Sequence, residues 1–176
     1  MPVTVQPGDK LSSVMIYTNE MLAVGDVITK EVLRVSTWLR TAAIPEFIWL
    51  HDVKIIQFAS GAPRPLSFSE LHMPSAQVKA FHLKPPAQDP LDYDPSEPNR
   101  KMLPVTVLVG LFRFDGFLRM STQTDLDRFL EVAKEAYVSL YDIIITNPSL
   151  PNMGPMHVPF ALMRMAYVQF APRPAS

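Results

Sequence analysis

The sequence predicts a mainly β protein, of the β-rich α+β class, built from two tandem ββαββ repeats. The first observation is internal similarity: sliding the chain along itself by 91 positions, the separation of Gly25 and Gly116, aligns residues of the same apolar class without a gap. After a turn one residue shorter in the second repeat, the shift becomes 90, the separation of Asp52 and Asp142. The second observation is that runs rich in β-branched and apolar residues alternate with turn residues. The third is that the 18 prolines fall mainly between these runs, where a missing amide donor does least harm to a sheet.

The first repeat is expected to hold four strands and one short helix. Asn19 and Glu20 separate two β-rich runs and so indicate a hairpin. The helical segment spans only about two turns, so it must pack on the sheet to be stable. The last strand follows a loop marked by Pro63 and Pro65. The expected elements are strands 14–18 and 21–28, helix 34–41, and strands 47–58 and 76–83.

The second repeat is expected to follow the same order with a clearer helix. Within the long apolar run 105–120, Gly110 or Gly116 supplies the bend or bulge that a strongly curved sheet requires. Thr124 is the expected helix N-cap, with Asp127 three residues later in place of the usual Glu or Gln. The apolar stripe of this helix is Leu126, Phe129, Leu130 and Ala133, and the strands that complete the repeat are 137–146 and 160–170.

The expected domain layout follows from these segments. It comprises a flexible N-terminus 1–12, a first β-rich repeat 13–84, a Pro/Asp-rich linker 85–103, a second β-rich repeat 104–172 and a tail 173–176. Four or five short strands are too few for an open sheet to hide its edges, so we expect small barrel-like units related by a pseudo-twofold. The alternative is a single sandwich in which each repeat contributes one sheet.

Composition disfavours several classes of function. With 16 Lys+Arg against 17 Asp+Glu, the net charge of −1 gives no excess of positive potential for a nucleic-acid backbone. Cysteine is absent, which removes disulfides, thiolate nucleophiles and zinc sites with sulfur ligands. No segment approaches the roughly 20 apolar residues that span a bilayer, and the N-terminus has no signal-peptide core. We therefore expect a cytoplasmic protein without a membrane partner, whose oligomeric state the sequence leaves open.

The candidate binding residues cluster around the two aspartates at matching positions of the repeats. Trp38, Phe47 and Trp49 surround the short helix and the strand after it, and either line a groove or belong to the core. His51 and Asp52 are adjacent on a strand, so their side chains point to opposite faces unless a bulge re-aims one. The same position in the second repeat holds Tyr141 and Asp142. Each aspartate either marks one of two equivalent sites or caps a turn where its strand bends, which is the interpretation we favour.

Motifs for cofactor chemistry are missing. The four histidines have no spacing typical of zinc ligands, and the 6 glycines form no phosphate-binding loop. No nucleophile elbow of the form Gly-x-Ser-x-Gly occurs. We therefore expect no metal, no cofactor and no catalytic residues.

One stretch of the first repeat resembles a known family. Gly25 is followed by Arg34-Val35-Ser36 with Trp38-Leu39, and then by Phe47-Ile48 with Leu50 and Asp52-Val53. This order is similar to small bacterial proteins of unknown function that read Gly, Arg-Leu-Ser-Asp-x-Leu-Asn, Phe-Ile-x-Leu-x-Asp-Val. The chain departs from that pattern at Thr37 and Arg40, where those proteins tend to have Asp and Asn. The resemblance implies no activity.

The function expected from these observations is a non-enzymatic binding or assembly module that holds a protein partner in a groove or along an exposed edge. The first alternative is a nucleic-acid-binding tandem of Sm-like or OB-like small barrels. The second is a small-molecule enzyme without a recognisable motif, with a site built from His51, Asp52 or their counterparts in the second repeat.

Overall fold

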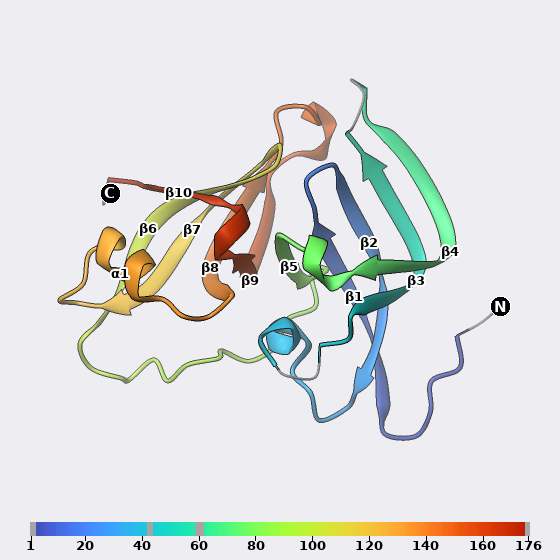
Figure 1. Ribbon diagram of the computed structural model, residues 1–176, viewed down its shortest axis with the longest axis horizontal. Helices are drawn as coiled ribbons and strands as arrows, with labels where there is room; N and C mark the ends of the chain where they lie inside the picture. The colour runs from blue at the N-terminus through green and yellow to red at the C-terminus, as the bar shows by residue number, and fades with distance from the viewer. Residues whose placement is uncertain (1–2, 42–43, 59–61, 175–176) are drawn as a thin grey trace.

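The ten strands found among the described residues form one antiparallel sheet. The computed structural model describes residues 3–41, 44–58 and 62–174, and within them the strand order is β10-β6-β7-β8-β9-β5-β1-β2-β3-β4 (Figure 1). The predicted mainly β class is confirmed. The predicted barrel-like units and the alternative two-sheet sandwich are wrong, because β5 pairs with β1 on one side and with β9 on the other and makes the sheet continuous. Each end strand, β10 or β4, pairs with one described strand, so the sheet is open.

The first half of the sheet runs from β1 to β5. Its elements are β1 (Asp9–Tyr17), β2 (Met21–Lys30), the 3-10 helix η1 (Val35–Arg40), β3 (Phe47–Gln57), β4 (Arg64–Pro74), the 3-10 turn η2 (Ser75–Gln77) and β5 (Ala80–Leu83). The expected hairpin, short helix and long third strand are present. The helix packs on the sheet as expected, with Val35, Trp38 and Leu39 buried in the core.

Strand β4 lies where the sequence predicted a loop. Pro63 and Pro65 indicated a break, but the strand runs from Arg64 and pairs with β3 along its length. The reason is its position at the end of the sheet. A proline lacks the backbone N–H that an inner strand needs to pair with both of its neighbours. An edge strand pairs on one side only, so it tolerates a missing N–H on its open side.

The second half runs from β6 to β10. Its elements are β6 (Arg100–Val109), β7 (Phe112–Ser121), α1 (Leu126–Val132), β8 (Tyr137–Thr146), the 3-10 turn η3 (Pro151–Met153), β9 (Met156–Arg164), the 3-10 turn η4 (Met165–Tyr167) and β10 (Gln169–Pro172). Gly110, with φ of 57°, provides the turn that divides the run 105–120 into two strands. The N-cap of α1 is Asp125 rather than Thr124, because the Asp125 carboxylate accepts the backbone N–H of Arg128 at 2.9 Å.

Two apolar cores lie on opposite faces of the central strands. Along β1, Met15 and Tyr17 belong to the core of the second half, whereas Val14 and Ile16 belong to the core of the first. Alternate residues of a strand point to opposite faces, so β1 has both faces covered. β5 and β9 also contribute to both cores. Each half therefore curls around its own core while sharing its central strands with the other (Figure 1).

The joint between the halves pairs unlike strands. Within each half the last strand lies beside the first, followed by the second, third and fourth, and the halves meet where β5 pairs with β9. A twofold relation, as the sequence led us to expect, would pair like strands with each other. The arrangement is head-to-tail instead, and it leaves β10 and β4 at opposite ends.

Each half carries a β-bulge beside a glycine. The pairing register shifts next to Gly25 between β2 and β3, and next to Gly116 between β7 and β8. The bulged strands contain Asp52 with φ of 48° and Asp142 with φ of 50°. A Cβ on Gly116 would lie 2.9 Å from the carbonyl oxygen of Tyr141, and one on Gly25 would lie 3.1 Å from that of His51. At Gly116 the backbones approach too closely for a Cβ, and at Gly25 a Cβ would fit only if its neighbours shifted by a few tenths of an ångström.

Replacing Gly116 by alanine should therefore destabilise the protein by about 1–3 kcal/mol, the usual cost of overpacking. Gly25→Ala should cost less, because its contact is longer. Urea unfolding followed by tryptophan fluorescence measures both values. Thr122→Ala at an exposed turn serves as the control. A Gly116→Ala protein as stable as the wild type would contradict the close approach described here.

Candidate functional site

The residues that the sequence indicated as a groove lie in different parts of the molecule. Trp38 is buried in the first core, whereas Phe47 and Trp49 are each 49% exposed on β3. Trp49 stacks on His72 of β4 with ring centroids 5.4 Å apart. Tyr141 and Asp142 belong to β8 in the other half. The structure brings Trp49 and His51 together, at 4.7 Å between ring centroids, but not the tryptophans with Tyr141.

The two aspartates act through their backbone. Asp52 and Asp142 are exposed at the bulges, and no hydrogen bond of either carboxylate is found within the described residues. Aspartate is among the few residue types enriched at positive φ. Their recurrence at the same place in both halves is therefore explained by the bulge conformation. His51, next to Asp52, is buried, and among the described atoms its Nδ1 has no hydrogen-bond partner.

His82 is paired with a tyrosine deep between the halves. Its Nδ1–H donates to the carbonyl of Leu83 at 2.7 Å, and the hydroxyl of Tyr17 lies 2.9 Å from Nε2 and donates to it. Both side chains have no exposed surface. Burial lowers the pKa of His82 to about 4 and raises that of Tyr17. The pair is thus a neutral hydrogen-bonded part of the core, out of reach of a substrate.

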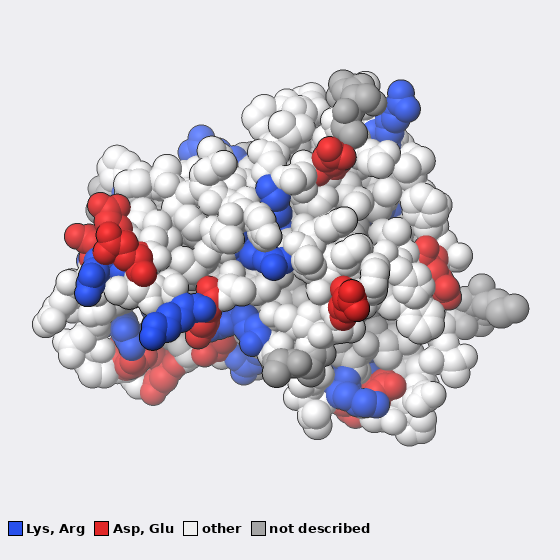
Figure 2. All heavy atoms as spheres, in the orientation of Figure 1, with Lys and Arg blue, Asp and Glu red and all other residues white. Residues whose placement is uncertain are grey.

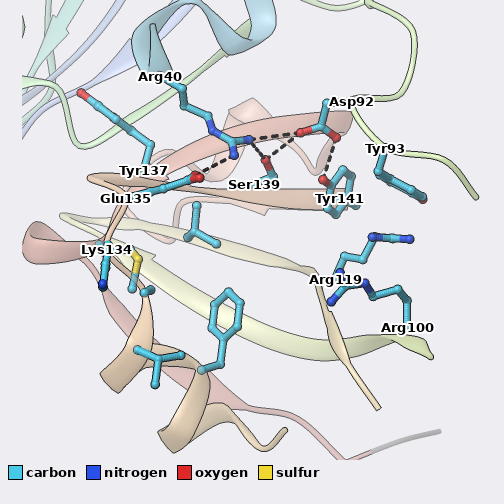
Figure 3. Close-up of a pocket in the computed structure, with 15 residues that line it drawn as sticks. Arg40, Asp92, Tyr93, Arg100, Arg119, Lys134, Glu135, Tyr137, Ser139 and Tyr141 are labelled. Carbon is cyan, nitrogen blue, oxygen red and sulfur yellow. Dashed lines mark hydrogen bonds and ion pairs between the residues drawn. The ribbon is translucent and has the colours of Figure 1, made fainter. Parts of the chain in front are cut away.

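A pocket of about 600 Å³ lies where the two halves and the segment between them meet. We call it the junction pocket. Its wall includes the end of η1, the connecting segment 84–99, the end of α1 and strand β8 (Figure 3). Basic and acidic side chains stand side by side in the region between η1, α1 and that segment (Figure 2).

Asp92 forms the centre of one wall of the junction pocket. Its carboxylate accepts hydrogen bonds from Tyr141 Oη at 2.7 Å, Ser139 Oγ at 3.0 Å and Arg40 Nη1 at 3.2 Å. Arg40 also donates to Ser139 at 2.8 Å and to Glu135 Oε2 at 2.7 Å. Burial, and then the hydrogen bond to Asp92, raise the pKa of Tyr141, so this hydroxyl remains a donor. The network holds this wall in one arrangement.

Two arginines form the far end of the pocket. The carboxylate of Glu97 accepts from Arg100 Nη2 and from Arg119 Nη2, both at 2.8 Å. These bonds, Arg100 first, lower the pKa of Glu97. Arg119 also donates to the carbonyl of Asp94 at 3.1 Å and lies 4.3 Å from the ring centroid of Tyr93. Hydrogen bonds from Ser96, and then the charge of Arg119, lower the pKa of Asp94. Two carboxylates, those of Glu97 and Asp94, therefore accompany the two guanidinium groups.

A second feature of the surface is the edge strand β4. All residues from Arg64 to Glu70 are exposed, including Leu66 at 40% and Phe68 at 44%. These two lie opposite Ile55 and Val53 of β3, which are buried in the first core. Side chains opposite each other share a face, so the apolar core face continues onto β4 and is exposed there.

Comparison with protein-family models, with curated protein sequences and with solved structures finds no match to this chain. Within the described part of the chain, no helix is long and apolar enough to cross a bilayer. The same residues contain no group of three or more potential metal ligands. The resemblance to small bacterial proteins stays a prediction.

Of the residues of the junction pocket, sequence reasoning named Tyr141 and missed the others. Arg40 and Ser139 are 99 positions apart, and Asp92 lies in a segment that reads as a linker. The one local signal was Arg40 itself, which departs from the asparagine of the resembled pattern. Sequence reasoning also missed strand β4, because prolines lie at and near the ends of that strand.

The burial of His82 predicts a specific pH dependence of stability. The unfolded chain takes up a proton near the ordinary pKa of 6.5, whereas the folded chain resists protonation down to about 4. Stability should therefore fall as the pH drops from about 6.5 to about 4, by about 3 kcal/mol from this group. Urea unfolding at a series of pH values measures the slope.

Two variants identify the source of that slope. His82→Gln should flatten it relative to the wild type, while Tyr17→Phe should keep it, because burial rather than the tyrosine is the main cause of the low pKa. Equal slopes for wild type and His82→Gln would show that His82 is not the group responsible.

Proposed function

We propose that this protein is a binding module that accepts an extended segment of a partner protein along the free edge of β4. The observation that carries the proposal is the combination of an open strand edge with the exposed apolar pair Leu66 and Phe68. An added strand satisfies the backbone groups of the edge, and its alternate side chains fill the apolar positions beside it. Phe47 and Trp49 of β3 are not part of this surface, because they alternate with the buried Ile48 and Leu50 and so lie on the opposite face of the sheet.

Strand β9 is the equivalent of β4 in the second half, and its apolar face is covered. It occupies the fourth position in the second half, as β4 does in the first, and β5 pairs along its other edge. Its Val158, opposite Ile143, is only 3% exposed and lies in the second core with Leu150 and Met153 packed against that core. This cover comes from the connection between β8 and β9, because β5 pairs with β9 only at Leu162 and Met163. At the matching position of β4, Phe68 is 44% exposed, and an extended segment with apolar side chains at alternate positions would cover it.

A second copy of this chain fits β4 less well. The joint at β9 depends on Arg164, whose N–H donates to the carbonyl of Lys79 at 2.8 Å and whose Nη1 donates to the carbonyl of Ala76 at 2.7 Å. The shift of 90 aligns Arg164 with Pro74, which has neither an N–H nor a guanidinium. These hydrogen bonds cannot form at β4, so head-to-tail assembly is disfavoured and the occupant is a different protein.

A duplicated origin of the two halves belongs to the same proposal. It is supported by the identical strand order of the halves and by the bulges beside Gly25 and Gly116 with an aspartate at positive φ in each. Under this proposal the two copies have diverged at their fourth strands. One is used inside the molecule to join the halves, and the other is left free for a partner.

The proposal predicts the peptides that the protein selects from a random library displayed on phage. Selected peptides should carry apolar residues at alternate positions and bind as extended strands, with protection of β4 amides from hydrogen exchange. Leu66→Lys should weaken their binding by about tenfold or more, since it places a charge in the apolar face. Isothermal titration calorimetry gives the affinities.

The matched control is Leu108→Lys, because Leu108 is 42% exposed and lies on β6 in the other half. It should leave peptide binding unchanged within about twofold. Peptides that bind both lysine variants alike would overturn the proposal. A wild-type dimer that Leu66→Lys converts to a monomer would also do so, because the occupant of β4 would then be a second copy.

A further inference from the structure

We propose that the junction pocket binds a small organic anion with an apolar body, such as an aromatic carboxylate. This site is separate from β4 and does not depend on the function proposed for that edge. The inference comes from three features of the pocket: its charges, its apolar lining and its fixed polar wall.

The charges of the pocket are unevenly placed. On the wall around Asp92, one guanidinium, that of Arg40, faces the carboxylates of Asp92 and Glu135. At the far end, Arg100 and Arg119 line the pocket, whereas the acidic residues beside them, Glu97 and Asp94, do not. Lys134 also lines the pocket and takes part in no ion pair between described residues. The end formed by the arginines is therefore where an anionic group is stabilised.

The lining between the charged groups is apolar and aromatic. Phe129 and Val132 come from α1, and Val138 from β8. Val132 is 50% exposed although it lies beside the pocket. Tyr93 presents its ring next to Arg119. A ligand that placed a flat apolar body over these side chains would remove apolar surface from water while its charge met the arginines.

The wall around Asp92 contributes rigidity rather than a free charge. All three donors to Asp92 come from side chains that are themselves held, and Tyr141 and Ser139 are each 8% exposed. A preformed wall reduces the entropy lost when a ligand binds. Because Asp92 and Glu135 place negative charge on this side, an anion should bind in one orientation, with its charge directed to Arg100 and Arg119.

The probe for the test is 2-naphthoate, with the uncharged 2-naphthamide as its isostere. Naphthoate should bind in a saturable manner at millimolar concentrations or below, and more tightly than naphthamide, with amide NMR shifts concentrated in α1, β8 and residues 92–100. Raising the salt concentration should weaken the binding, because the side chain of Arg100 is 40% exposed and its charge is screened by salt. Inorganic phosphate, which lacks an apolar body, should compete poorly.

Neighbouring residues of β6 supply a matched pair of variants. Arg100→Gln removes a cation from the pocket and should weaken naphthoate binding by about fivefold, the effect of one partly exposed ion pair. Lys101→Gln removes the same charge from the next residue, whose side chain points to the opposite face of the strand, and should leave binding unchanged. Val132→Ser should weaken naphthoate and naphthamide alike, since both use the apolar lining.

Several results would overturn the inference. One is the absence of saturable naphthoate binding, and another is equal affinity for naphthoate and naphthamide. The inference would also fail if Arg100→Gln and Lys101→Gln weakened binding equally, or if inorganic phosphate bound the pocket as tightly as naphthoate. Shifts concentrated on β4 would also overturn it, because the ligand would then occupy the partner edge. Leu66→Lys should leave naphthoate binding intact, so the inference and the proposed function can fail independently.

Discussion

The structure depends on the short strand β5, which is paired on both sides. Lys79, just before it, donates its N–H to Tyr17 of β1 and accepts the N–H of Arg164 from β9, both at 2.8 Å. Ala80 then enters the second core while Phe81 enters the first. These few residues supply the hydrogen bonds that join the two halves into one sheet. Each half therefore curls around its own core without its first and last strands pairing to form a closed barrel. The open ends of the sheet, and hence the free edge of β4, are consequences of that joint.

What the sequence could predict was local. The β1–β2 hairpin, the buried face of η1 and the bulge at Gly116 all follow from neighbouring residues, through apolar periodicity and backbone conformation. Strand β4 could not be predicted, since a proline reads as a break unless one knows that the strand lies at an edge. The junction pocket could not be predicted either. Arg40, Asp92 and Ser139 meet only because the connecting segment crosses between the halves, and no local pattern encodes that crossing.

The aspartates of the bulges show why recurrence in sequence is a poor guide to chemistry. From the sequence, Asp52 and Asp142 could mark two equivalent sites or take a structural role where their strands bend, the interpretation we favoured. In the structure both are exposed residues with positive φ, opposite a glycine where the backbones approach closely. Their role is to let the third strand of each half bulge. Neither the shift of 90 nor that of 91 aligns Asp92 with another acidic residue. It is nevertheless the Asp92 carboxylate that accepts hydrogen bonds from three side chains. The two aspartates that recur at matching positions are therefore not the ones that form the polar site.

The connecting segment is a structural part of that site and not only a linker. On the side of the first half, the N–H of Ser36 donates to Asp89 at 2.9 Å and Arg34 donates to the carbonyl of Leu91 at 3.0 Å. On the side of the second half, Arg119 holds the carbonyl of Asp94 and the carboxylate of Glu97. Asp92 and Tyr93 lie between these anchors, so their positions are set from both sides. Neither half alone can form the junction pocket, because one supplies Arg40, the other supplies Ser139 and Tyr141, and the segment between them supplies the carboxylate that joins the three.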